Sequence, residues 1–543
     1  MNLEGTTRLR VLRGPNLWTR GPVLEATLPS DTASPQNLAN RVLELQRQCG
    51  SKVSFADARE NTIAVEFENE TLARECLAAA LRGEPDLAAL RALADDILLG
   101  PNTRALADAA SRRGIPVRRL GNGSVLILGH GAHQRRLEGA RTDRTSAIGE
   151  AIGWEKPLAK ELLRAVGLPT PEGRLVTDVD DALRAAKELG GLIVIKPESA
   201  NHGRSVFVGL SGREEIAAAY ESARNEGETT NVIVERLVPG AEHRVLVVDG
   251  HVAAATRGDA LYITGDGTHT VSELVDEVNR DPRRSDDPDS PLYPVTLDPM
   301  TLATLAHQGY TPAAIPEPGT RVLVQRNGNL STDVTGHVHA ANESLCVLAA
   351  EVIGLDIAGI DLVVEDIGRP MTEQGGAFLE VNAMPGLMMH LRPGNSTPQP
   401  VDDIIVRALF PEASDGRIPI AALSGLPGLG GQLVDTLGRH SVFARFGNSS
   451  GMLLDPRLQA AIFDVPDLLV EGSGLPFDFC RLAVFDESPL TPARRVLLDS
   501  VADEGCVFLP RGTDWPPANR CDVVFYDNLA NLSDSIARRL LAK

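Results

Sequence analysis

Two apolar segments that carry acidic side chains constrain the fold of this chain more than any other feature. They are residues 359–363 (GIDLV) and 378–382 (FLEVN), and both have the composition of buried β-strands. Side chains alternate between the faces of a strand, so Glu380 and Asn382 lie on one face. Because a buried charge must be paired or bound to a metal, one cation held by Asp361, Glu380 and Asn382 explains all three residues. These oxygen ligands predict Mg²⁺.

Basic residues upstream of the acidic segments indicate phosphate binding. The segment 192–197 (LIVIKP) places Lys196 at the end of a predicted strand, and Lys156 lies on a predicted amphipathic helix before it. A lysine at a strand end can attract the α- and β-phosphates of ATP as a point charge. Either lysine alone would more simply be solvated, but the acidic segments downstream favour ATP and Mg²⁺ as cofactors. The turn after the strand adds further candidates for phosphate binding: His202, Gly203, Arg204 and Ser205.

Glu235 is a candidate ligand for the nucleoside part of ATP. It lies near the end of the predicted strand 231–236 (NVIVER). There it could accept a hydrogen bond from ribose or lie beside the adenine, while neighbouring main-chain groups read the base. The alternative is a salt bridge on an edge strand.

Four arginines are candidates to clamp a phosphoryl group or a carboxylate through two parallel hydrogen bonds: Arg257, Arg283, Arg284 and Arg326. Arg257 comes just after the predicted strand 245–255. We assign Arg257 and Arg326 to catalysis and Arg283 and Arg284 to substrate binding. An ion pair of Arg257 or Arg326 with the acidic segments is the alternative to a metal site.

The combination of these residues predicts a ligase reaction. ATP with Mg²⁺ can phosphorylate a carboxylate, and an amine can then attack the resulting acylphosphate. Such a reaction depends on positioning and charge neutralisation more than on a protein nucleophile. The sequence offers no persuasive Ser/His/Asp arrangement that would suggest a different chemistry.

Composition limits the partners and the compartment. The formal charge of −20 argues against nucleic acid, whose phosphates need a basic surface. The six cysteines have no C-x-x-C spacing, which argues against a zinc site or a disulfide framework. The chain has no basic, apolar leader and no run of about 18 apolar residues. We therefore expect a cytoplasmic protein that neither crosses nor binds a membrane.

The 543 residues alternate between helical and strand patterns and predict a mixed α/β and α+β multidomain fold. We expect boundaries near residue 141 and after residue 412, where the polar segment 411–417 is a linker. Residues 281–294 are rich in Asp, Arg, Pro and Ser and predict a long loop near the active site or a disordered lid. Predicted helices include 36–48, 70–81, 156–166 and 179–189, and a further predicted helix begins within 99–103 and runs to 113.

Short motifs occur along most of the chain. They include residues 12–18 (LRGPNLW), 129–136 (GHGAHQRR), 142–146 (TDRTS), 281–284 (DPRR) and 353–361 (IGLDIAGID). Read in order, these motifs resemble those of the cyanophycin synthetase family. Its members are bacterial enzymes that make the storage polymer cyanophycin, multi-L-arginyl-poly-L-aspartate.

The resemblance implies an N-terminal α+β domain at 1–141, an ATP-grasp domain at 142–412 and a Mur-ligase-like α/β module at 417–543. In the family, the ATP-grasp domain extends the C-terminal carboxyl of the polymer, and the Mur-like module attaches arginine to the aspartate side chain. The resemblance also implies a homo-oligomer. It implies that Ser146 and the turn 202–205 meet the polymer end and the phosphates. Finally, it implies ATP and Mg²⁺ binding by Lys156, Lys196, Glu235, Asp361, Glu380 and Asn382.

Two departures from the family pattern indicate the subtype. The phosphate loop of the Mur-like module has the form GTNGKTT, whereas residues 425–431 read GLPGLGG, with Leu429 in place of the lysine and Gly430 in place of the Mg²⁺-binding hydroxyl. The N-terminal helix also lacks an H-x-x-E-H motif. The chain is thus similar to the branch that joins preformed β-aspartyl-arginine dipeptides to cyanophycin through the ATP-grasp site alone, beside a degenerate, truncated Mur-like module.

A third departure bears on the substrate. Asp333 and Val334 follow the N-L-S-T segment where the family has two glycines, and Gln325 stands where an arginine is expected, with Arg326 next to it. Two alternatives therefore stay open. One is an ATP-grasp ligase for a different amino acid or dipeptide. The other is a non-catalytic, polymer-binding partner subunit of a full-length synthetase.

Overall fold

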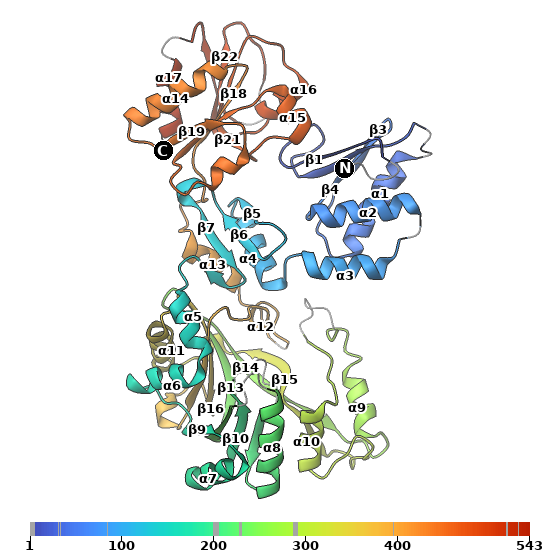
Figure 1. Cartoon of the computed structure of the whole chain (residues 1–543), viewed down its shortest axis with the longest axis vertical. Helices are drawn as coiled ribbons and strands as arrows, with labels where there is room; N and C mark the ends of the chain where they lie inside the picture. Colours follow the sequence, from blue (N-terminus) through green and yellow to red (C-terminus); the bar gives the residue numbers. More distant parts are fainter. Residues whose placement is uncertain are drawn as a thin grey trace. The chain divides into compact units, whose positions relative to one another are not determined.

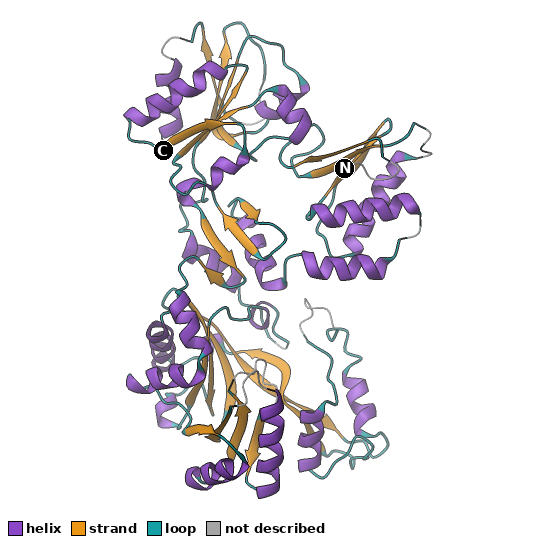
Figure 2. Ribbon diagram, viewed as in Figure 1, coloured by secondary structure: helices purple, strands orange, loops and turns teal. Residues whose placement is uncertain are grey.

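The structure is a computed structural model. It describes residues 6–30, 32, 34–83, 85–198, 206–226, 231–285, 292–394, 396–516, 520–529 and 532–542, without the side chains of residues 226 and 326–330. The chain divides into two compact units (Figure 1). Unit 1 comprises Met1–Leu99, Gly114–Arg135 and Ser414–Lys543, and unit 2 comprises Gly100–Arg113 and Arg136–Ala413. Helices and strands are mixed in both units (Figure 2), which confirms the predicted fold class.

The first part of unit 1 is a four-stranded antiparallel sheet with helices packed against it. Its strand order is β1-β2-β4-β3. Apolar residues of α1 and α2 pack against the sheet, and the predicted helices 36–48 and 70–81 are confirmed to within a residue or two. The elements are β1 (Arg8–Leu12), β2 (Val23–Thr27), α1 (Pro35–Gln48), β3 (Ala56–Arg59), β4 (Thr62–Glu66), α2 (Glu70–Arg82) and α3 (Leu87–Ile97).

The last part of unit 1 is a parallel sheet with helices on both faces. Its strand order is β19-β20-β18-β21-β22-β23. Successive residues of β18 point to opposite faces, so Ala422 joins one apolar core and Leu423 the other. Its strands are β18 (Ile420–Ser424), β19 (Ala444–Gly447), β20 (Ala460–Asp464), β21 (Cys480–Phe485), β22 (Val501–Pro510) and β23 (Asp522–Tyr526), and its helices are α14 (Pro427–Arg439), α15 (Asp467–Ser473), α16 (Pro492–Leu498) and α17 (Leu532–Leu541). The hairpin strands β5 (Val117–Arg119) and β6 (Val125–Leu128) also belong to unit 1.

Unit 2 contains two antiparallel sheets. The smaller sheet has the order β11-β10-β12-β9 and packs against α7 and α8, and the larger has the order β15-β14-β13-β16-β17 and packs against α11 (Figure 1). The strands of the smaller sheet are β9 (Gly173–Val176), β10 (Ile193–Pro197), β11 (Phe207–Leu210) and β12 (Val232–Arg236). The strands of the larger are β13 (Ala241–Val248), β14 (His251–Thr264), β15 (Arg321–Asp333), β16 (Ile357–Val364) and β17 (Ala377–Asn382).

The helices of unit 2 include those that reach the predicted site. They are α4 (Pro101–Arg112), α5 (Ala147–Trp154), α6 (Lys156–Ala165), α7 (Val179–Leu189), α8 (Arg213–Glu226), α9 (Val271–Val278), α10 (Pro299–His307), α11 (Ala340–Ile353), α12 (Met388–Leu391) and α13 (Val401–Leu409). The short strands β7 (Arg135–Glu138) and β8 (Arg141–Thr142) form a hairpin before α5. No helix in the described part of the chain is long and apolar enough to span a membrane.

One strand prediction was wrong. Residues 245–255 do not form a single strand, because β13 ends at Val248 and β14 begins at His251. Asp249 and Gly250 both have positive φ angles, 48° and 78°, and form the turn of a hairpin. The Asp-Gly pair is a strong hairpin signal that the apolar run around it concealed.

The chain passes between the two units at four places, and the predicted domain boundaries at 141 and 412 lie close to two of them, 135/136 and 413/414. The N-terminal and C-terminal segments cluster together in unit 1. The division into three domains stays a prediction.

Candidate functional site

The two acidic segments are neighbouring strands. β16 and β17 pair antiparallel, with Asp361 opposite Glu380 and Gly359 opposite Asn382. A register shift follows Asp361, at the point where the carboxylates face each other. Asp361 is 6% exposed, so its charge lies almost entirely out of water. The sequence predicted the acidic strands, and the structure adds that they are hydrogen-bonded partners.

Arg244 partly compensates the charge of Asp361. It lies opposite Asp361 on β13, and its Nη1 is 3.1 Å from Oδ2 of Asp361. Burial raises the pKa of Asp361 to about 7, and the nearby Glu380 adds to the rise while Arg244 opposes it. Arg244 alone thus does not return the pKa of Asp361 to the ordinary range of a carboxylate. Sequence reasoning missed Arg244, because only the strand register brings it to Asp361.

Lys156 reaches the second carboxylate. It is the first residue of α6, and its Nζ is 2.8 Å from Oε1 of Glu380. Burial would raise the pKa of Glu380, but Lys156 and Lys196 outweigh burial and hold it below its usual range. Two predicted phosphate ligands therefore act electrostatically on one predicted metal ligand.

Lys196, Glu235 and Lys160 form a buried group of three charges. Nζ of Lys196 lies 3.0 Å from Oε2 of Glu235, and Nζ of Lys160 pairs with the other carboxylate oxygen, Oε1. Each of the three residues is less than 8% exposed. Gly173 of β9 lies opposite Glu235, and any side chain at that position would meet the Glu235 backbone and Cγ. The fold thus fixes Glu235 between two lysines.

The two lysines are in different protonation environments. Burial disfavours the charged form of both. At Lys196, Glu235 and Glu380 outweigh this effect and raise the pKa, whereas the pKa of Lys160 is lowered to about 8 because Lys196 adds to the effect of burial. Sequence reasoning missed Lys160. Its position four residues after Lys156, on the same helix face, was the available signal.

The predicted catalytic arginine Arg257 lies at a half-exposed position on β14. Its Nε is 2.9 Å from Oδ1 of Asp259, and Thr332 donates to the other oxygen of Asp259 at 2.5 Å. The structure does not bring Arg257 to Asp361 or Glu380. The backbone of Arg326 lies in β15, but its side chain is outside the described residues.

The predicted substrate-binding residues lie at separate places in unit 2. Ser146 caps α5 by accepting a hydrogen bond from the Gly149 N–H at 3.2 Å. Arg283 pairs with Asp281 at 2.7 Å and donates to the Gly394 carbonyl. Arg284 is buried and donates to the Tyr293 carbonyl at 2.7 Å.

The predicted phosphate turn, with His202, Gly203, Arg204 and Ser205, lies outside the described residues. The middle of the predicted loop 281–294 does too, at 286–291.

Asn382 is half-buried at the end of β17. In the described part of the chain, no group of three or more His, Cys, Asp and Glu side chains is arranged to hold a metal. The predicted metal ligands include only two such side chains, those of Asp361 and Glu380, together with the carboxamide of Asn382.

The glycine-rich segment 425–431 of unit 1 begins as a loop and enters α14 at Pro427, and protein side chains pack closely around it. Leu429 is 3% exposed and belongs to the apolar core between α14 and the sheet. The ring of Phe446 occupies the space that a side chain at position 430 would need, and the carboxylate of Asp486 does the same at Gly425. Within residues 425–431, no lysine and no hydroxyl group is present to bind a phosphate or its metal.

Asp486 has its own partner. Nη1 of Arg494 is 2.6 Å from Oδ1 of Asp486, and Arg494 is buried. The loop is thus closed by an apolar ring on one side and an ion pair on the other.

The fold and side chains of unit 2 are typical of the ATP-grasp class: two antiparallel sheets, with lysine on a strand of one and the acidic pair on the other. The chain is similar to cyanophycin synthetases. It is 37% identical to the enzyme from Nostoc sp. over 413 residues, which cover 71% of this chain and 46% of that protein. It is 32% identical to the enzyme from Synechocystis sp. over 493 residues, which cover 81% of this chain and 56% of that protein.

Other proteins share less of the chain. The glutathione biosynthesis bifunctional protein GshAB of Streptococcus thermophilus is 31% identical over 299 residues, which cover 52% of this chain and 39% of that protein. The crystal structure of a bifunctional glutathione synthetase from Pasteurella multocida matches with a TM-score of 0.44 and 26% identity over 63% of this chain and 49% of that one. No protein-family model matches. The chain spans about half the length of the cyanophycin synthetases it matches.

Proposed function

We propose that unit 2 is an ATP-dependent carboxylate–amine ligase. The observation that carries the proposal is the pairing of Asp361 with Glu380 on neighbouring strands, with Lys156 within ion-pair distance of the second carboxylate. The buried Asp361 and the half-buried Glu380, next to lysines, support a cation site beside a phosphate site. The similarity to cyanophycin synthetases supports the same activity.

The donor set fits Mg²⁺. Asp361, Glu380 and Asn382 offer oxygen ligands only, which is what a hard cation prefers. Burial raises the pKa of Asp361 to about 7 even though Arg244 lies beside it. A second positive charge at this position would therefore stabilise the ionised carboxylate. When bound, Mg²⁺ would neutralise the phosphate oxygens of ATP.

The chain's own residues orient the two substrates. Lys156 and Lys196 attract the phosphates, and Glu235 holds Lys196 in place. A carboxylate oxygen of the first substrate attacks the γ-phosphorus, and ADP leaves with the electron pair of the broken bond. The amine of the second substrate then attacks the acyl carbon, phosphate leaves, and the amine loses a proton. Arg257 and Arg326 are the candidates to stabilise the transferred phosphoryl group.

The substrates we propose are the C-terminal carboxylate of cyanophycin and the amine of β-aspartyl-arginine. The similarity to cyanophycin synthetases supports the polymer as acceptor. The filled loop of unit 1 supports a preformed dipeptide over free arginine, because residues 425–431 offer no charge for a second ATP. We therefore assign no arginine-ligating activity to unit 1 and treat it as a degenerate Mur-like module. Ser146, Arg283 and Arg284 are the candidates to bind the polymer end, and the expected setting is a homo-oligomer in the cytoplasm.

A substrate panel tests the proposal. ADP release is measured with ATP and Mg²⁺, with and without cyanophycin primer, and with β-aspartyl-arginine or with aspartate plus arginine as the amine. We expect release only with primer and dipeptide together. Release with another amine identifies a ligase of different specificity. No release with any amine, together with retained polymer binding, identifies a non-catalytic partner.

A further inference from the structure

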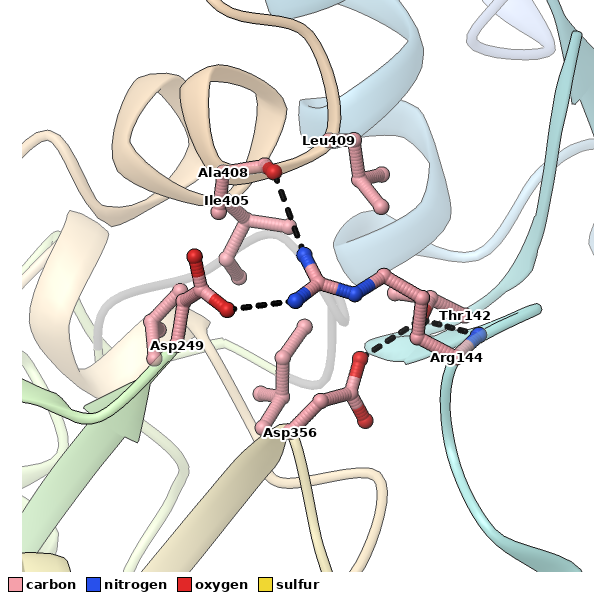
Figure 3. A pocket seen from close by; sticks show the side chains of 9 residues that line it. Thr142, Arg144, Asp249, Asp356, Ile405, Ala408 and Leu409 are labelled. Atoms are coloured by element: carbon pink, nitrogen blue, oxygen red, sulfur yellow. Dashed lines mark hydrogen bonds and ion pairs between the residues drawn. The ribbon is translucent and has the colours of Figure 1, made fainter.

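The TDRTS motif makes a hydrogen-bonded anchor at the start of β16. The hydroxyl groups of Thr142 and Thr145 donate to the two carboxylate oxygens of Asp356, each at 2.6 Å. Figure 3 shows the contact of Thr142 with Asp356. Each hydroxyl group also accepts a backbone hydrogen bond at 3.0 Å, from the N–H of Arg144 and of Thr142 respectively. Both hydroxyl groups are therefore held from two sides. Asp356 directly precedes β16, the strand of Asp361.

Three further contacts hold the anchor to the β13–β14 turn and to α13. The Asp249 N–H, in the β13–β14 turn, donates to the Asp356 carbonyl at 2.8 Å. The guanidinium of Arg144 pairs with the Asp249 carboxylate at 2.6 Å and donates to the Ala408 carbonyl at 3.3 Å (Figure 3). The cavity among these side chains is about 10 Å³. That space is no larger than one water molecule, so the anchor is not a ligand site.

The anchor leads directly into α5, the helix that precedes the lysine-bearing α6. Ser146 follows Thr145 and caps α5. Two glycines of α5 allow backbone contact with the sheet region: a Cβ at Gly149 would lie 2.6 Å from the Gly354 carbonyl oxygen, and one at Gly153 would lie 3.0 Å from the Val381 carbonyl oxygen. α5 is therefore held against Gly354, which precedes β16, and against Val381 of β17.

α6 begins where α5 ends, with Glu155 between them. Its first turn places Lys156 on Glu380, and its second places Lys160 on Glu235. These two contacts reach β17 of the larger sheet and β12 of the smaller one. The positions of both lysines thus depend on where α5 is held.

We infer that Thr142, Thr145 and Asp356 are positioning residues that set the location of α5 and α6, and through them the placement of Lys156 and Lys160 at the nucleotide site. They do not touch the nucleotide. The inference rests on the proposed function, because it concerns the same site. Loss of the two hydroxyl groups frees α5 at its start, and the lysines then sample positions away from Glu380 and Glu235.

The test compares a pair of substitutions that removes both hydroxyl groups with a pair that keeps them. Thr142→Val with Thr145→Val removes the hydroxyl groups, and Thr142→Ser with Thr145→Ser keeps them. Thr436→Val, a buried threonine of unit 1, is the matched control. Amide hydrogen exchange of residues 147–165 is measured without nucleotide, and the Kd for ATP with Mg²⁺ is measured by calorimetry.

We expect the valine pair to speed exchange in residues 147–165 and to raise the Kd for ATP about tenfold, or about 1.4 kcal/mol. The serine pair and the control stay within about twofold of the parent. In a Lys156→Ala background, the valine pair raises the Kd by a smaller factor than in the parent, because one of the two lysines through which the anchor acts is gone.

Unchanged exchange in residues 147–165 overturns the inference, and so does an equal rise in Kd with and without Lys156. If the double valine variant does not fold, each single valine variant is measured in the same way. If the parent protein binds no ATP, the proposed function fails, and hydrogen exchange alone decides whether the anchor holds the helices.

Discussion

Unit 2 and unit 1 each contain a place where a phosphate site is expected, and the two places are filled differently. In unit 2, Lys156 pairs with Glu380, and Lys156 and Lys196 together hold the pKa of Glu380 below its usual range. In unit 1, the glycine-rich loop is packed with Leu429 and Phe446. One region retains buried charges, which are costly when unpaired, and the other has replaced them with apolar contacts.

The stability cost of buried charges helps to distinguish a functional site from a structural one. Replacing buried charges by well-packed apolar groups is often neutral or stabilising. A chain that keeps a buried group such as Lys160–Glu235–Lys196 gains little stability from it, which favours a chemical role. A segment that is packed with Leu429 and Phe446 gains stability from apolar contacts and offers no charge to a phosphate.

The largest effect should follow from removing one acidic ligand. We expect Glu380→Gln to lower the rate of ADP release at least about a thousandfold, because both the cation site and the partner of Lys156 lose a charge. Glu365→Gln, at an exposed position directly after β16, is the matched control and should keep the parent rate. Steady-state assays with primer and dipeptide measure both. A Glu380→Gln enzyme with parental kcat would remove the metal assignment.

The next effect concerns stability of unit 2. Glu235→Gln leaves two buried ammonium groups without their shared carboxylate, and we expect a loss of about 3 to 4 kcal/mol in the free energy of unfolding. A second change, Lys160→Met, should recover part of that loss because it removes one of the two like charges. Urea unfolding of the parent and both variants measures the difference. A loss below about 1 kcal/mol would mean that water reaches this group.

A smaller effect is expected in unit 1. Leu429→Lys puts an ammonium into an apolar core and should cost about 2 to 3 kcal/mol of stability. The rate of the ligase reaction per folded molecule should not change, and arginine ligation should not appear. Leu468→Lys, at a position that is 80% exposed on α15, is the control and should cost almost nothing. New arginine-dependent ADP release by Leu429→Lys would show that the loop is still a working phosphate site.

The smallest effect depends on pH and compares a buried histidine from each unit. Burial lowers the pKa of His130 in unit 1 and of His390 in unit 2 from 6.5 to about 4. The unfolded chain takes up a proton as the pH falls below 6.5, whereas the folded chain does so only near 4. Each histidine therefore costs stability on acidification, about 2 kcal/mol at pH 5.

Urea unfolding at pH 7 and pH 5 tests this difference. We expect His130→Gln to reduce the acid-induced loss of stability in unit 1, followed by the fluorescence of Trp18 and Trp515. The exposed His440→Gln should leave the loss unchanged. An identical pH dependence in the parent and His130→Gln would mean that this histidine is protonated in the folded state.

The sequence predicted those parts of the site that are encoded locally. Asp361, Glu380 and Lys196 were identified because a charge within a short apolar segment is visible without any knowledge of the fold. Arg244 and Lys160 were missed, because their partners lie across a strand pair or on another sheet. The turn at Asp249 was missed because the apolar residues on both sides form one continuous run. Strand register and helix placement depend on contacts between residues that are far apart in the chain, so a single sequence does not reveal them.

The packing of unit 1 also determines what a phosphate site at residues 425–431 would require. A lysine at position 429 would have to leave the core, the ring of Phe446 would have to move before position 430 could carry a hydroxyl group, and the pair of Asp486 with Arg494 would have to break. Each step alone lowers stability and restores nothing. A nucleotide site there would therefore need several simultaneous substitutions, and no single change along the way would be rewarded by binding.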